Sequence, residues 1–145
     1  SVLSEWKNFG GKDTLKSFGV KKPADIPKDY IQWMKDLEYY IELDNFLIVH
    51  AGFNFGIDNP FEDSQSMLWT RDFIPDKDKL KGKIVIHGHV PINLEMIYFL
   101  KENHTYQYID LDNGIYMTER EGFGNLVALE LNSMDLVIQY NLDMA

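Results

Sequence analysis

The sequence predicts a mixed α+β fold, with helices at the start of the chain and β-strands in the remainder. Helical spacing of apolar residues is confined to the first 37 positions. From residue 39 onward, short apolar runs bounded by turn residues replace that period. We expect these strands to form a mostly antiparallel sheet. The 145 residues contain no repeat or composition shift that marks a boundary, so a single domain over 1–145 is predicted.

Two helices are expected before residue 38. The first begins near Asp13, a capping residue, places Leu15 and Phe18 on one apolar face, and stops at Gly19. After a loop, the second begins at Pro27, a residue favoured in the first helical turn. Its apolar side chains recur at helical spacing, at Tyr30, Ile31, Met34 and Leu37.

Strands are expected wherever a short apolar run lies between turn residues. Tyr39–Leu43 and Phe46–Val49 flank Asp44 and Asn45, a pattern typical of a β-hairpin. The other expected strands are Lys83–Ile86, Met96–Leu100, Tyr106–Ile109, Ile115–Met117, Leu126–Leu131 and Leu136–Tyr140. Turns are expected at Asn132-Ser133 and at Asp112-Asn113-Gly114.

Composition excludes several classes of site. The chain has no cysteine, which rules out disulfides, zinc–thiolate sites and cysteine nucleophiles, and which agrees with a cytoplasmic location. The net charge of −9 has the wrong sign for a broad nucleic-acid-binding surface. No apolar run is long enough to span a membrane, and no signal peptide is recognisable. We therefore expect neither nucleic acid nor membrane as a partner, and a phosphorylated substrate would need locally placed cations.

Histidines follow two of the expected strands. FLIV is followed by His50-Ala51-Gly52, and KIVI by His87-Gly88-His89. Sites in α/β sheets gather at such strand ends, and a neutral imidazole is a good ligand for zinc, manganese or iron. A histidine at a strand end can equally be hydrogen-bonded scaffolding. Composition alone leaves both interpretations open.

Five sequence blocks in order resemble bacterial phosphoprotein phosphatases of the calcineurin-like metallophosphoesterase superfamily, which also includes diadenosine tetraphosphatases. The blocks are GGKDTLKSFG at 10–19, FLIVHAG at 46–52, LWTRDF at 68–73, VIHGHVP at 85–91, and LDNG at 111–114 followed by GNLVALEL. Single blocks such as HAG are short. All five together, at family-like spacing over nearly the whole chain, are specific.

The resemblance implies the C-terminal half of a four-layer α/β/β/α sandwich. It also implies a hydrolase, a serine/threonine phosphatase-like metallophosphoesterase that cleaves a phosphate ester with a metal-bound water at a dinuclear site. Two divalent ions would be the cofactors, manganese first, with iron or zinc as alternatives. Phosphoserine or phosphothreonine proteins and dinucleoside polyphosphates are both possible substrates, and the sequence does not separate them.

The resemblance also assigns roles to individual residues. His50 and His89 would ligate the second metal, and His87 would lie in the second shell or the core. Arg71, in a long loop expected over 51–82, would hold phosphate oxygens, because a guanidinium fork matches two of them. The alternative is a surface arginine paired with a neighbour such as Asp72. His104 is expected to be an ordinary surface residue.

Asp112-Asn113-Gly114 fits both a tight hairpin turn and the family's D-x-G block, and we favour the turn. The upstream family blocks D-x-H, G-D-x-x-D-R-G and G-N-H-[DE] do not occur here. No catalytic residue is therefore expected in this chain, which should be inactive alone and pair with a missing N-terminal half or with another copy. The alternatives are a non-catalytic binding or dimerisation module derived from the same fold, and a sugar- or peptide-binding β-domain with coincidental histidines.

Overall fold

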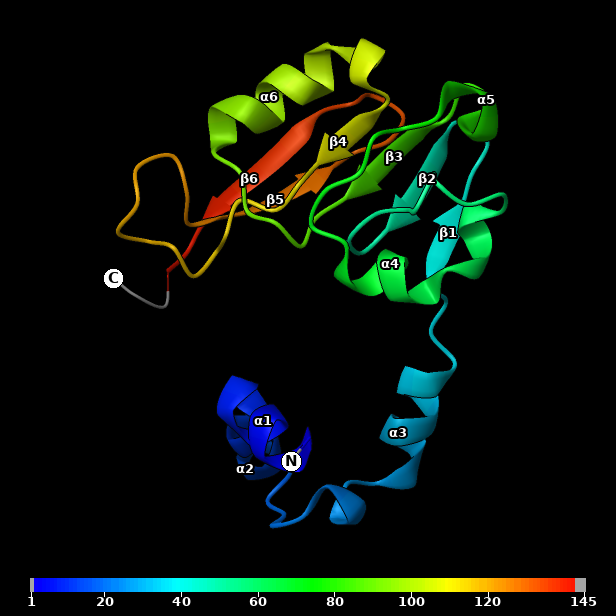
Figure 1. The fold of residues 1–145 in the computed structure, drawn as a ribbon. Helices are drawn as coiled ribbons and strands as arrows, with labels where there is room; N and C mark the ends of the chain where they lie inside the picture. The colour runs from blue at the N-terminus through cyan, green and yellow to red at the C-terminus, as the bar shows by residue number, and fades with distance from the viewer. Residues whose placement is uncertain (1, 143–145) are drawn as a thin grey trace. The chain divides into compact units, whose positions relative to one another are not determined.

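The computed structural model describes residues 2–142 and divides the chain into two compact units (Figure 1). The first is Ser1–Glu38 and the second is Tyr39–Ala145, and each is described by itself. That both belong to one catalytic domain remains a prediction. Among the described residues, no helix has the length and apolar character needed to cross a membrane.

The first unit is helical, as the sequence predicts. It consists of α1 (Val2–Trp6), a π-type turn η1 (Lys7–Gly11), α2 (Lys12–Ser17), a 3₁₀ turn η2 (Pro23–Asp25) and α3 (Lys28–Lys35). The ring of Trp6 packs directly on Gly11, where a Cβ atom would lie 2.5 Å from ring carbons. Leu15 of α2 is buried, whereas α3 buries none of its side chains within the described unit.

A four-stranded sheet, in the order β1-β2-β3-β4, is the centre of the second unit. Its strands are β1 (Tyr40–Glu42), β2 (Phe46–Val49), β3 (Ile84–His87) and β4 (Tyr108–Asp110). The predicted hairpin is confirmed, since β1 pairs antiparallel with β2. The expectation of a mostly antiparallel sheet is wrong here, because β2–β3 and β3–β4 are parallel. The physical reason is that parallel strands are covered on both faces and read as continuous apolar runs, as FLIV and IVI do.

The two faces of this sheet have different coverings. Leu47 and Val85 are register partners and face a core that includes Phe53, Met67 and Leu80. On the opposite face, Ile48 and Ile86 line a cavity together with residues of a separate two-stranded sheet. That sheet is the hairpin β5 (Asn125–Leu129) and β6 (Leu136–Tyr140), which confirms the strands and the turn predicted there.

Residues 94–102 form a helix where the sequence analysis expected a strand at Met96–Leu100. Helix α6 (Leu94–Glu102) begins after Asn93, whose side chain accepts a hydrogen bond from the Met96 backbone amide. Ile97 and Leu100, three residues apart, are its buried positions. α6 runs beside β4 and connects β3 to it, as a parallel pair requires (Figure 1).

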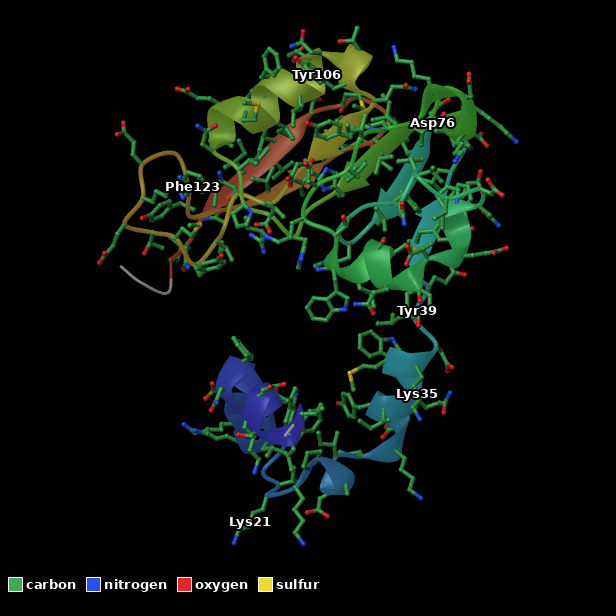
Figure 2. All side chains as sticks on the ribbon, in the orientation of Figure 1. Lys21, Lys35, Tyr39, Asp76, Tyr106 and Phe123 are labelled. Carbon is green, nitrogen blue, oxygen red and sulfur yellow. The ribbon has the colours of Figure 1, made fainter. Side chains whose placement is uncertain are left out.

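The connections also differ in part from the prediction. The segment 51–82 is not one loop but contains η3 (Pro60–Glu62), α4 (Ser64–Trp69) and α5 (Lys77–Leu80). Asp76, labelled in Figure 2, starts α5 by accepting hydrogen bonds from the backbone amides of Asp78 and Lys79. The strand expected at Ile115–Met117 is absent, because these residues lie in a turn-rich connection between β4 and β5.

Candidate functional site

His50 and His89 meet at one edge of the four-stranded sheet. His50 follows β2, and His89 lies two residues after β3. Because β2 and β3 are parallel, their carboxyl ends lie at the same edge. His50 Nε2 lies 3.0 Å from His89 Nδ1, and the ring centroids are 4.8 Å apart. The structure thus brings together the two histidines that the sequence predicts to be neighbours.

The backbone around the pair fixes this approach. The Gly88 amide donates a hydrogen bond of 2.9 Å to the His50 carbonyl, which joins the two strand ends. His89 itself has a φ of 78°, an uncommon conformation for a residue with a Cβ, and this turns the chain sharply after Gly88. A side chain at position 52 would clash with Phe73, because a Cβ atom on Gly52 would lie only 2.4 Å from the Phe73 ring.

The environment of His50 favours the uncharged imidazole. Burial lowers its pKa below the ordinary value of 6.5, the His89 ring lowers it further, and the charge of Asp112 opposes both effects. A metal ligand must be deprotonated, so a lowered pKa reduces the competition of protons for His50. Trp69, at the end of α4, presents its ring edge-on to His89 at 6.1 Å.

The separation of the two nitrogens fits two ligands of one metal ion. At metal–nitrogen distances of about 2.0–2.1 Å, adjacent ligands of a tetrahedral or octahedral ion lie roughly 3–3.4 Å apart, and the observed value is 3.0 Å. Within residues 2–142, no third His, Asp or Glu joins a group that could hold a metal ion. The described residues therefore offer two ligands and not a complete coordination sphere.

Arg71 lies two residues beyond α4 and is exposed. It forms no ion pair with Asp72 or with any other carboxylate of the described residues. Arg71 lines a cavity of about 280 Å³, whereas His50 and His89 line another of about 400 Å³. His87 borders both cavities. Arg71 therefore lies near the histidine pair but does not line the cavity of the pair, and its phosphate-binding role remains a prediction.

His87 and Asp110 form a second polar pair of positions that the sequence analysis did not single out together. They are register partners at the ends of β3 and β4. His87 Nε2 is buried and has no hydrogen-bond partner within the described chain. Asp110 is 4% exposed, and its burial raises its pKa to about 7 although the Asp112 amide donates a hydrogen bond to it. A carboxylate that ends a buried strand is the sequence feature that could have indicated this position.

The segment Asp112-Asn113-Gly114 is not a hairpin turn, which corrects the favoured prediction. β4 and β5 belong to different sheets, so no hairpin joins them. Asn113 is 1% exposed, and its amide side chain binds the carbonyls of Ile92 and Gly122 and both nitrogens of Asn125. These partners lie on two separate segments, so Asn113 sits in a loop that connects them and not in a two-residue hairpin turn. His104 is exposed in a 3₁₀ turn, as predicted.

Comparison with known proteins adds no family name to these observations: no family model, curated protein or solved structure matches the chain.

Proposed function

We propose that this chain supplies two histidine ligands to a metal-dependent phosphoesterase site. The observation that carries the proposal is the 3.0 Å approach of His50 Nε2 to His89 Nδ1 at the ends of two parallel strands. Supporting it are the five sequence blocks that resemble phosphoprotein phosphatases, with both histidines in the expected blocks. The remaining ligands would come from a polypeptide segment other than this chain.

The roles of the residues follow from their chemistry. His50 and His89 would hold a divalent ion, manganese first, and such ions supply charge stabilisation and an activated water in phosphoester hydrolysis. Arg71, exposed and without an ion pair among the described residues, would orient the phosphate of a phosphoprotein or a dinucleoside polyphosphate. The hydrogen bond from the Gly88 amide would fix the position of His50, and burial, which lowers the pKa of His50, would keep its imidazole uncharged and available to the metal.

Metal binding by the purified chain tests the ligand assignment. We expect Co²⁺ to give a visible absorption spectrum with nitrogen ligation, and both His50→Ala and His89→Ala to weaken binding by at least about tenfold. His104→Ala is the matched control, because His104 is an exposed histidine away from the pair. Equal loss of binding in all three variants, or no loss in the first two, would contradict the assignment.

Activity is tested separately. The chain alone should not hydrolyse a generic phosphomonoester with added Mn²⁺, because two imidazoles without a bridging carboxylate do not hold two ions about 3.5–4 Å apart. With the remaining ligands supplied by the native gene product, we expect hydrolysis of the phosphomonoester. His89→Ala should then lower the rate of hydrolysis by at least about a hundredfold. Turnover that copurifies with the isolated chain and disappears in His89→Ala would refute the half-site.

A further inference from the structure

A cavity of about 280 Å³ lies beside the histidine pair. It is lined by Ala51 and Val90, the residues that directly follow His50 and His89. The His50 and His89 side chains themselves line the other cavity, and His87 borders both. A dry apolar cavity of about 150 Å³ is enough to bind benzene. This one therefore has room for an aromatic ring and a small polar substituent.

Most of the wall is apolar. Three rings pack on one another: the Phe73 centroid lies 5.0 Å from His87 and 5.7 Å from Tyr108, and His87 lies 5.6 Å from Tyr108. Aliphatic side chains complete the lining, at Val90, Ile92, Met96 and Leu100. A lining of aromatic and apolar groups with few polar ones is typical of small-molecule sites.

The polar groups of the cavity have unmet bonding capacity. Arg71 contributes a guanidinium that no described carboxylate pairs, with Asp72 beside it at the rim. His87 Nδ1 contacts only the Gly88 carbonyl, an acceptor, so Nδ1 carries the proton and the buried Nε2 offers a lone pair without a donor. Asp110 is almost completely buried, and burial raises its pKa to about 7, so below that pH most of the carboxyl is uncharged and repels an anion less strongly.

From this geometry we propose that the cavity accepts the aromatic ring of an aryl phosphate whose phosphate group is held by Arg71. This substrate class rests on the proposed phosphoesterase function, because it uses Arg71, which lines the cavity, as the phosphate ligand. A hydroxyl or N–H group on the ring would donate to His87 Nε2. The substrate would then be a phosphate ester with an aromatic leaving group.

The test uses two phosphonates that the protein cannot hydrolyse, with the metal-free chain. Phenylphosphonate and methylphosphonate carry the same anionic group, and only the first carries a ring. Titration calorimetry should show phenylphosphonate binding at least about tenfold more tightly, a difference of about 1.4 kcal/mol. Equal affinities would overturn the proposal.

A pair of variants on α6 shows whether the ring occupies this cavity. Met96 lines the cavity, and Tyr98, of similar exposure on the same helix, does not. Met96→Trp should fill the cavity and remove the preference for phenylphosphonate, whereas Tyr98→Trp should retain it. Arg71→Gln should weaken both phosphonates about equally. A preference that survives Met96→Trp with the chain still folded by circular dichroism would overturn the assignment.

A peptide that contains phosphonomethyl-phenylalanine distinguishes two sources of the aromatic ring, phosphotyrosine in a protein and a small aryl phosphate. Binding of the peptide more tightly than phenylphosphonate assigns protein phosphotyrosine, and equal binding assigns a small aryl phosphate; either result supports the proposal. The experiments test the ring-binding cavity and the proposed metal site separately. The phosphonates are tested without metal, and Co²⁺ binding at His50 and His89 is measured without phosphonate.

Discussion

The four-stranded sheet and the β5–β6 hairpin use the same kinds of apolar residues but bury them very differently. In the sheet, Leu47 is 1% exposed and Val85 is 0% exposed. In the hairpin, Leu126 is 60% exposed and Val137 is 63% exposed. Leu47 and Val85 lie on the face of the sheet that packs against the core, whereas the hairpin alternates between half-buried and exposed positions. The contribution of an apolar side chain in a strand to stability therefore depends on how much of its surface is buried, and not on the residue type alone.

Hydrogen bonds of one buried side chain connect the start of the hairpin to the rest of the second unit. Asn113 donates to the Ile92 and Gly122 carbonyls at 3.0 and 2.8 Å, and its Oδ1 accepts from both the backbone and the side chain of Asn125. One buried amide thus connects the segment before α6 with the start of β5. The core face of the sheet is stabilised by apolar burial, and the start of the hairpin is held by these hydrogen bonds.

The largest expected difference between the two regions concerns pH. Burial of Asp110 in β4 raises its pKa from 3.8 to about 7. The folded state then binds a proton that the unfolded state has lost, so the free energy of unfolding falls as pH rises from about 4 to 7. Asp110→Asn should remove this slope and make the protein more stable at pH 8, by as much as about 4 kcal/mol.

Urea unfolding of both proteins at pH 4.5 and pH 8 measures this difference. The wild type and Asp110→Asn should be nearly equal at the lower pH, since the wild-type carboxyl is protonated there. A constant difference at both pH values would show that the substitution acts through packing and not through ionisation.

A matched pair of leucine truncations tests the difference in burial. Leu47→Ala should lower the free energy of unfolding by about 3 kcal/mol, because it leaves a cavity in a fully buried site. Leu126→Ala should change it by less than about 0.5 kcal/mol, because that side chain is mostly exposed. Denaturant unfolding at one protein concentration compares the two. A large cost for Leu126→Ala that depends on protein concentration would show that another copy covers the hairpin, as a dimerisation module requires.

The smallest effect is expected at the turn of the hairpin, and its pH dependence has the opposite sign to that of Asp110. Glu130 accepts hydrogen bonds from the backbone amide of Ser133 and the side chain of Asn132, which lower its pKa from 4.5 to about 2. This contribution to stability is present above pH 4.5 and is lost as pH falls toward 2. Glu130→Gln should therefore lower the melting temperature slightly at pH 6 and not at pH 2. A loss that is equal at both pH values would indicate packing instead of charge.

Much of the fold could be predicted because its elements carry local signals. The strand at Leu136–Tyr140 and the helix that begins after Pro27 follow directly from alternation and helical spacing. Helix α6 was not predicted because Ile97, Tyr98 and Phe99 are β-branched or aromatic residues, which favour strands, although Asn93 provides a helix cap just before them. Parallel pairing was missed because hydrogen-bond direction depends on chain crossovers that no local pattern encodes.

The candidate site divides in the same way. Each of His50 and His89 follows an apolar run, so their meeting at one sheet edge could be predicted from the sequence. The cavity of Arg71, His87 and Asp110 could not, because its three polar groups come from a loop and two different strands. Whether a strand-end carboxylate is buried and uncharged depends on what packs over it, and here α6 does so from a segment that the sequence analysis assigned to a strand.

The parallel pairing of β2 with β3 has a consequence for the order of folding. The partners His50 and His89 are 39 residues apart, and closing a loop of that length has an entropic cost before any contact rewards it. The β5–β6 hairpin, by contrast, joins neighbouring segments and belongs to a class of structure that forms in about 1–10 μs. Non-local pairings are the slow steps in small domains. We therefore expect the two imidazoles to come together late in folding. Metal binding by His50 and His89 would then report when the pairing of β2 with β3 is complete.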